Sequence, residues 1–217
     1  MQTSLPGSFW DRLNAQCRLD LQKMARQGTF AKDQMIFRAG ETLDAFFIIH
    51  KGLCKVFRVQ PNGSESILSF FGPGSVVALQ PLLQTPPTDW TRLVYPANCM
   101  ALTNTELSQC GLQQLPALLD QNPDIGSCLQ AEFVNRTAMF RDKAALLMLP
   151  SASDRIIGFL EQMGARGNEV YLPIPKNQLA NYLGLSAEAL SRNLGKLKRA
   201  GLLKESDGYY ELTDQLD

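Results

Sequence analysis

The sequence has few of the side chains from which metal and catalytic sites are usually built. Of its 217 residues one is a histidine, His50, which precedes Lys51 and Gly52 at the end of an apolar run and is expected to be an exposed turn residue. Haem and metal sites draw on several imidazole, thiolate or carboxylate ligands, and a Ser-His-Asp hydrolase needs a histidine beside its nucleophile. A protein that is not an enzyme and holds neither haem nor a metal is predicted, with a cupin-like enzyme as the remaining catalytic alternative.

Disulfides are not expected either. The cysteines are odd in number, widely separated and form no C-x-x-C pair, whereas a disulfide framework usually shows an even count. Buried cysteine commonly behaves as a small apolar side chain. We therefore expect all five to be free: Cys17, Cys54, Cys99, Cys110 and Cys128.

Long apolar runs and net charge are absent as well. No run reaches the length of a membrane span, and the first residues, MQTSLPGSFWDRL, lack the basic start and apolar centre of a secretion signal. A cytoplasmic protein without membrane contact is predicted. Lysine plus arginine and aspartate plus glutamate both number 21, so the placement of basic residues, and not their sum, has to indicate a nucleic-acid partner.

The segment 176–199 has the spacing of a helix-turn-helix. Residues 177–183 predict a short amphipathic helix, Gly184 permits the turn, and Ser186 can cap a second helix. Small Ala180 stands where two helices must approach closely. Three leucines at helical spacing predict the buried face of the second helix: Leu190, Leu194 and Leu197.

A polar face of the second helix carries the chemistry of base recognition. Glu188, Ser191 and Arg192 fall at positions i, i+3 and i+4. Arginine can donate two hydrogen bonds to guanine, glutamate can accept one from the amino group of cytosine, and serine can serve either a base or a phosphate. These three residues are predicted to read DNA bases. The alternative is a solvated helix on an ordinary helical hairpin.

Residues around this face predict contacts with the backbone of double-stranded DNA. They are Lys176, Ser186, Lys196, Lys198 and Arg199. After Gly201 the stretch LLKESDGYYEL alternates apolar and polar residues around an Asp-Gly turn signal. A hairpin there makes the motif a winged helix-turn-helix.

The first half of the chain predicts an antiparallel β domain, a small barrel or sandwich, so the fold class is α+β. Short β-prone runs alternate with turn signals rich in glycine, proline and asparagine. The expected strands are 35–37, 45–50, 54–59, 66–71, 76–79 and 99–107. Four of their apolar side chains are expected in the core: Phe46, Ile48, Phe70 and Val76.

Between the two halves, residues 112–119 predict a short helix and residues 125–149 a long one. The long helix has apolar residues on more than one face, so it either pairs with its twin in a homodimer or packs as a core helix on its own β domain. Pro150 and Ser151 mark a break, the expected hinge, before a helix over 154–163.

Taken together, these residues resemble the CRP/FNR family of transcription regulators. The resemblance runs from about Phe30 to the C-terminus and is carried by FRAGETLDAFFIIHKGLCKVFRVQPNGSESILSFFGPGSVV and by the helix-turn-helix. Glu188, Ser191 and Arg192 match the family's Glu-x-x-Ser-Arg recognition pattern. Ala187 stands where the cyclic AMP receptor branch has an arginine, so the match is closer to the FNR-like branch.

The resemblance implies a β-roll at 1–115, a linker and dimerisation helix at 116–150, and a winged helix-turn-helix at 151–217. Such a homodimer binds inverted repeats of a half-site similar to TTGAT and contacts RNA polymerase. FNR-like regulators with an iron–sulfur centre carry an N-terminal cysteine cluster, and here only Cys17 lies in that region. An iron–sulfur cluster is therefore not expected.

The chain departs from the family at the place where a cyclic nucleotide would bind. Gly74 and Ser75 lie in a turn that can present amides to a phosphate, and Arg92 stands about where the family has its arginine. Leu93 replaces the family's serine, and the loop GSVVALQPLLQ has no glutamate. We expect an effector pocket at Gly74, Ser75 and Arg92 for an unknown ligand, and no binding of cyclic AMP. Arg92 has an alternative role in a surface ion pair with Asp89.

A rival function of another class fits the same pattern. The first half can be a cyclic-nucleotide-binding or small-molecule-binding module whose C-terminal helices contact protein instead of DNA. Binding to an inverted TTGAT repeat that depends on Glu188 and Arg192 distinguishes the two.

Overall fold

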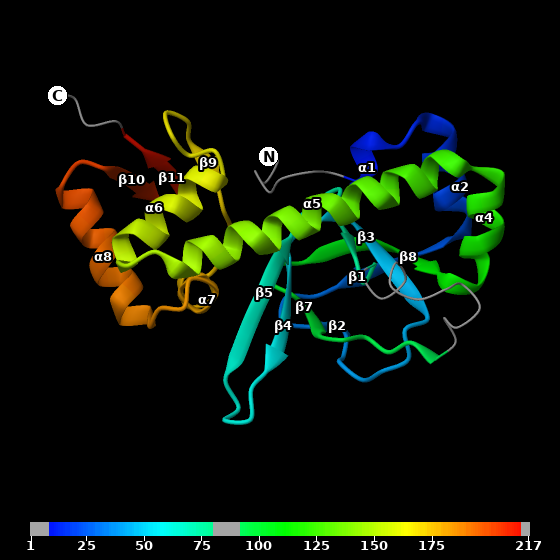
Figure 1. Ribbon diagram of the computed structural model, residues 1–217, viewed down its shortest axis with the longest axis horizontal. Coiled ribbons are helices and arrows are strands. Elements are labelled where there is room, and N and C mark those ends of the chain that lie inside the picture. The colour runs from blue at the N-terminus through cyan, green and yellow to red at the C-terminus, as the bar shows by residue number, and fades with distance from the viewer. Residues whose placement is uncertain (1–8, 80–91, 214–217) are drawn as a thin grey trace.

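The computed structural model describes residues 9–79 and 92–213 (Figure 1). A β-roll lies at one end of the molecule, a smaller unit, here called the reader (152–212), lies at the other, and one long helix runs along both. The first elements are α1 (Phe9–Arg12), α2 (Ala15–Met24), β1 (Ala25–Phe30), β2 (Met35–Phe37), β3 (Ala45–Lys51), β4 (Cys54–Val59), β5 (Glu65–Phe71), β6 (Val76–Val77), β7 (Asn98–Ala101) and β8 (Thr105–Gly111). The later ones are η2 (Leu112–Gln114), α4 (Leu115–Gln121), α5 (Pro123–Met148), α6 (Ala152–Gln162), β9 (Val170–Tyr171), α7 (Lys176–Tyr182), α8 (Ala187–Arg199), β10 (Leu203–Ser206) and β11 (Tyr209–Leu212).

Two four-stranded sheets make the roll, with strand orders β1-β8-β3-β6 and β2-β7-β4-β5. Their described strand pairs are antiparallel, and the α+β class is confirmed. The four apolar side chains expected in the core are buried: Phe46, Ile48, Phe70 and Val76. β5 is the outer strand of its sheet, so one side of its backbone has no neighbour among the described strands.

The single strand expected over 99–107 is wrong. β7 ends at Ala101 in one sheet and β8 begins at Thr105 in the other. Thr103 Oγ1 accepts a hydrogen bond from Leu53 N–H (2.9 Å), and Thr105 Oγ1 donates to Leu53 O (3.3 Å). Threonine is common in strands, and here its hydroxyls hold the corner where the chain changes sheets.

The elements before β2 were not foreseen. Asn14 caps α2 by accepting from Cys17 N–H (2.8 Å), and β1 follows α2 directly and pairs with β8. β1 reads ARQGTF, in which too few apolar residues alternate for a strand signal. Its position is fixed by pairing with a strand about 80 residues away, which local sequence cannot show.

His50 is not the exposed turn residue that was expected. It lies in β3, half-buried, with Nε2 2.7 Å from Ser108 Oγ on β8. The ring of Trp10 packs edge-on against it, with centroids 5.2 Å apart. Burial lowers the pKa of His50. The expectation failed because α1, which carries Trp10, was not foreseen.

All five cysteines are free, as predicted. Burial raises the pKa of the Cys110 thiol to about 12, and burial together with the neighbouring Cys54 thiol raises that of Cys99 well above its usual value. The thiolate is the reactive form of cysteine. Cys99 and Cys110 therefore act as small apolar groups in the roll.

The long helix α5 begins at Pro123, whose missing N–H costs nothing in the first turn, and it spans 26 residues. After Pro150, Ser151 caps α6 by accepting a hydrogen bond from Asp154 N–H (3.1 Å). The predicted break between the two helices is confirmed at this place. Within 9–79 and 92–213, none of the helices combines the length and the apolar character needed to cross a membrane.

The described apolar side chains form two cores. The first fills the roll and takes in side chains of α1, α2, α4 and the start of α5. The second fills the reader and continues into the roll through five side chains of β4, β5 and the adjoining turns: Leu53, Phe57, Ile67, Phe70 and Leu102. The reader is therefore packed against the roll as well as linked to it.

Candidate nucleic-acid interface

α7 and α8 form the predicted helix-turn-helix. Gly184 adopts a φ of +64° between them, a conformation that glycine reaches without strain. Ser186 Oγ caps α8 by accepting from Ala189 N–H (3.1 Å), and Ala180 is buried between the helices. The three leucines expected in the core are buried: Leu190, Leu194 and Leu197.

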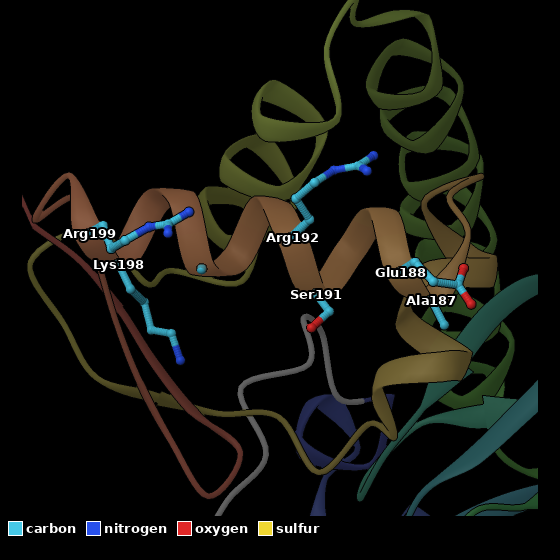
Figure 2. A pocket seen from close by; sticks show the side chains of 7 residues that line it. Ala187, Glu188, Ser191, Arg192, Lys198 and Arg199 are labelled. Atoms are coloured by element: carbon cyan, nitrogen blue, oxygen red, sulfur yellow. The ribbon is translucent and has the colours of Figure 1, made fainter.

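The opposite face of α8 is open to solvent (Figure 2). Glu188, Ser191 and Arg192 are exposed and line one shallow hollow. Four further residues complete its lining: Ala187, Gly195, Lys198 and Arg199. Figure 2 shows Glu188 at one end of this face and Arg199 at the other. The structure thus brings the three predicted base-reading residues together on an accessible surface.

Glu188 is held in its ionised form. Hydrogen bonds from its own backbone N–H and from the Ser186 side chain lower the pKa of its carboxyl. The first turn of a helix favours a negative charge because its free N–H groups point towards it. An ionised carboxylate only accepts hydrogen bonds, which suits the amino group of cytosine.

Lysines from both ends of the motif converge on Glu205 of β10. Its carboxylate accepts from Lys176 Nζ (2.9 Å) and Lys198 Nζ (2.7 Å), and its side chain is 7% exposed. Burial raises the pKa of Glu205, but hydrogen bonds from the two lysines outweigh this and leave it lowered. An ammonium group has three donors, so both lysines keep N–H groups for phosphate oxygens. Lys196 and Arg199 are exposed nearby.

The predicted hairpin completes a wing. β10 and β11 are antiparallel, and Asp207 and Gly208 turn between them with φ of 48° and 85°. β9 adds a third strand beside β11, where the rings of Tyr171 and Tyr209 lie 4.8 Å apart. A winged helix-turn-helix is therefore present.

Two family descriptions match separate parts of the chain. The cyclic nucleotide-binding domain matches residues 27–122, and the Crp-like helix-turn-helix domain matches residues 154–215. The transcriptional activator protein FnrA of Stutzerimonas stutzeri is 26% identical over 212 residues, which cover 94% of this chain and 84% of FnrA. The chain belongs to the CRP/FNR family of transcription regulators. As a CRP/FNR-type regulator it binds DNA through its helix-turn-helix and is not an enzyme.

Solved structures share the fold of this CRP/FNR regulator. FixK2 from Bradyrhizobium japonicum superposes with a TM-score of 0.73 at 21% identity, covering 87% of this chain and 92% of FixK2. The c-di-GMP-responsive regulator CLP of Xanthomonas campestris gives a TM-score of 0.74 at 19% identity, covering 93% of this chain and all of CLP. The order of roll, long helix and reader is thus common to all three.

Asn193 lies on the protein side of α8 in this regulator. Its Oδ1 accepts from Ser153 Oγ on α6 (3.0 Å), and its amide N–H donates to Ala189 O (2.8 Å). These hydrogen bonds place its side chain against α6 and away from the exposed face of α8. Asn193 therefore helps to hold α8 in position.

The first helix of the motif docks on the outer strand of the roll, a contact that sequence reasoning missed. Asn181 on α7 accepts from Ile67 N–H (3.1 Å) and donates to Glu65 O, so its amide pairs with β5 much as a neighbouring strand would. Lys55, buried in the roll, pairs with Glu65 and donates to Gln178 Oε1 on α7 (3.0 Å). In sequence, the two amides look like solvated residues of a surface helix, so no signal indicated this contact.

The long helix reaches the same place through Lys143. Its ammonium donates to the carbonyls of Ile67 and Leu68 and lies 4.0 Å from the ring centroid of Tyr182. That ring packs against Phe70 and Phe159, with centroids 5.1 Å and 5.6 Å away. Burial lowers the pKa of Lys143 to about 8. Roll, long helix and reader meet at this junction of β5, α5 and α7.

Gly74 and Ser75 lie in the turn between β5 and β6, and Arg92 lies before β7, so the effector pocket expected from these three residues stays a prediction. Gly74 N–H donates to Ile49 O on β3 (2.7 Å) and Ser75 N–H donates to Gly72 O in the turn (3.1 Å), so both amides already have acceptors within the chain. Arg92 is exposed, and Asp89, its alternative partner, lies outside the described residues.

A cavity of about 300 Å³ is lined by strands of both sheets, by residues 78–79 and 94–97, and by α5. Its lining is mainly apolar and includes Phe71 of β5 and Phe140 of α5, with the guanidinium-bearing side chains of Arg58 and Arg136. No group of three or more metal-ligating side chains occurs in the part of the chain that the structure describes.

Proposed function

We propose that this regulator recognises inverted-repeat DNA sites, with half-sites similar to TTGAT, as a homodimer, and that Glu188, Ser191 and Arg192 read the bases. The shared exposed face of these residues on α8 carries the proposal. Recognition helices place their N-terminal residues against base edges in the major groove. Arg192 then donates to guanine O6 and N7, Glu188 accepts from a cytosine amino group, and Ser191 bonds to a base or a phosphate.

Contacts with phosphates hold the duplex while the bases are read. The side chains proposed for this role are Lys176, Ser186, Lys196, Lys198 and Arg199. Glu205 supports the proposal because it fixes two of these lysines at opposite ends of the motif. Such contacts contribute equally to the affinity for every DNA sequence, and their contribution falls as the salt concentration rises.

Exposed apolar side chains on α5 support the dimer. Val134 is 66% exposed, Phe140 43% and Met148 84%. These side chains are additional to the face of the helix that packs against the roll and reader. Large apolar groups that gather on one exposed helix mark an interaction surface. Pairing of two α5 helices places the two copies of α8 about 34 Å apart, one turn of B-DNA. The functional division we propose is 1–115 for the roll, 116–150 for the dimer helix and 151–217 for DNA binding.

An effector bound at the roll is proposed to control the relative placement of the two copies of α8. The 300 Å³ cavity touches β5 and α5, and β5 is the strand on which α7 docks. A ligand that binds two arrangements of this junction with different affinity shifts the population between them. The amides of Gly74 and Ser75 already donate to Ile49 O on β3 and to Gly72 O, which supports an effector other than cyclic AMP. The regulator is proposed to act in the cytoplasm together with RNA polymerase.

Selection of bound fragments from random DNA tests the function most directly. We expect an inverted repeat with half-sites similar to TTGAT, and we expect Glu188→Ala and Arg192→Ala to lose binding to it in a gel-shift assay. A binding module whose C-terminal helices contact protein enriches no DNA sequence, which would reject this function. Calorimetry with cyclic AMP and cyclic di-GMP separately tests the effector.

A further inference from the structure

Gly195 lies inside α8, where glycine is an unfavourable choice. Glycine in the interior of a helix destabilises it relative to alanine, because the unfolded chain loses more conformational freedom. Three physical reasons can make glycine the fitting residue in such a place. The backbone conformation excludes other residues, a neighbouring atom leaves no room for a Cβ, or a ligand approaches the backbone.

The first two reasons do not apply to Gly195. It lies within the regular helix and is not among the glycines with positive φ in the described ranges. A Cβ built on it meets no atom of the described residues within 4 Å. By contrast, a Cβ on Gly158 of α6 would lie 2.9 Å from Leu146 Cδ1, so packing accounts for that glycine.

The position of Gly195 points to the third reason. It lines the hollow of Figure 2, with Ser191 and Arg192 one turn before it and Lys198 and Arg199 one turn after. All four neighbours carry groups that can bond to bases or phosphates. Gly195 therefore leaves bare backbone between the base-reading part of the helix and its basic end.

We propose that a sugar–phosphate strand of the specific site lies against α8 at Gly195, in the space that a Cβ would fill, which makes Gly195 a specificity-determining residue. This rests on the proposed function, because it requires α8 to enter the major groove. Without a side chain at this point the helix sits deep enough for Ser191 and Arg192 to reach base edges. A Cβ holds the helix away and stretches those hydrogen bonds.

Gly195→Ala is expected to move two measurements in opposite directions. The melting temperature rises by about 1–4 °C, because alanine favours the helix and nothing in the protein opposes its methyl group. Affinity for the selected inverted repeat falls about tenfold or more, as for a methyl group forced into a packed contact. Affinity for random duplex changes less than about twofold, since phosphate contacts alone hold that looser complex. Gly195→Leu lowers specific affinity further.

Gly126→Ala is the matched control. Gly126 also lies inside a helix, α5, and its Cβ would meet Leu119 Cδ2 at an ordinary 3.7 Å, away from α8. This variant is expected to stabilise the protein as Gly195→Ala does and to leave DNA affinity unchanged. Sedimentation of both variants checks that the oligomeric state of the wild type is kept.

The outcomes separate this proposal from the proposed function. If Gly195→Ala binds the selected repeat as well as the wild type while Arg192→Ala does not, the role of Gly195 is overturned and the base-reading function stands. A lowered melting temperature, or an equal loss on random and selected duplex, overturns it too. If the wild type prefers no DNA sequence, the proposed function fails and the role of Gly195 fails with it.

Discussion

The exposed face of α8 in the reader and the face of the long helix α5 against the roll use polar side chains in opposite ways. On α8, Glu188, Ser191 and Arg192 face solvent, where a partner can reach them. On α5, by contrast, Glu132 and Arg136 form a buried ion pair (3.2 Å) beside β5. The face of α8 leaves its polar groups accessible to another molecule, whereas the buried pair on α5 is used within the chain.

This difference teaches that folding stability and DNA recognition rest on separate residues. Burial raises the pKa of Glu132 and lowers that of Arg136, although each faces the opposite charge of the other. Glu132 Oε2 has no hydrogen-bond partner within the described parts of the chain. Removal of one member of such a pair leaves an uncompensated buried charge, whereas removal of an exposed side chain costs the folded state little.

The largest expected effect comes from Arg136→Ala. The carboxylate of Glu132 stays buried without its partner, so the free energy of unfolding falls by about 3–5 kcal/mol, measured by urea unfolding. Arg141→Ala is the control, because its ion pair with Asp142 is exposed; we expect a change of at most about 1 kcal/mol. Similar losses for both variants would remove the distinction between buried and exposed pairs.

Arg192→Ala is expected to weaken DNA binding and to leave the free energy of unfolding almost unchanged. Binding to the selected repeat weakens by about 1–3 kcal/mol and preference relaxes at one base pair, because a bidentate contact with guanine is lost. The free energy of unfolding changes by less than about 0.5 kcal/mol. Fluorescence anisotropy with the selected repeat and its single-base variants measures the first quantity. A uniform loss across all variants would assign Arg192 to the backbone instead.

Lys198→Ala has a smaller effect that is the same on every duplex. Loss of one phosphate contact reduces the slope of log affinity against log salt by about 1 and leaves the sequence preference unchanged. Titrations at several salt concentrations check this. A change of preferred sequence would contradict the backbone role and place Lys198 among the base-reading residues.

The smallest effect concerns Lys143 at the junction of β5, α5 and α7. Its folded pKa of about 8 lies below the ordinary 10.5, so the cost of burying its charge is present below pH 8 and is relieved as pH rises from 8 towards 10.5. Relative to Lys143→Met, the wild type should gain about 1 kcal/mol of unfolding free energy over this window, after discounting for partial exposure. A flat difference in urea unfolding across this pH range would show that the amine is not desolvated.

Local signals predicted the reader well. The turn at Gly184, the cap at Ser186 and the Asp207-Gly208 hairpin each depend on a few adjacent residues, and leucine spacing marks the buried side of α8. The same spacing identified the opposite face, so the candidate base-reading residues followed from it. Which bases they contact stays a prediction.

Contacts between distant segments were not predictable in this way. Hydrophobic periodicity shows that a face is buried but not what covers it, so β1, the corner at Thr103 and the environment of His50 were missed. The donation of the Gly74 N–H to Ile49 O on β3 is another contact that the local sequence does not show; the effector pocket expected at Gly74, Ser75 and Arg92 stays a prediction. The docking of Asn181 on β5 had no sequence signal, because an asparagine appears the same in the sequence whether its amide bonds to a backbone or to water.

The pairing of Asn181 with β5 also bears on how such regulators can be divided or recombined. A fragment that ends after α5 leaves Glu65 O and Ile67 N–H without that amide, and Phe70 without its packing partners in the reader. Bare strand edges and uncovered apolar side chains promote self-association, so we expect the isolated sensor half to aggregate. A chimaera with a different DNA-binding half must therefore reproduce the contacts that Asn181 and the reader make with β5, in addition to supplying a new DNA specificity.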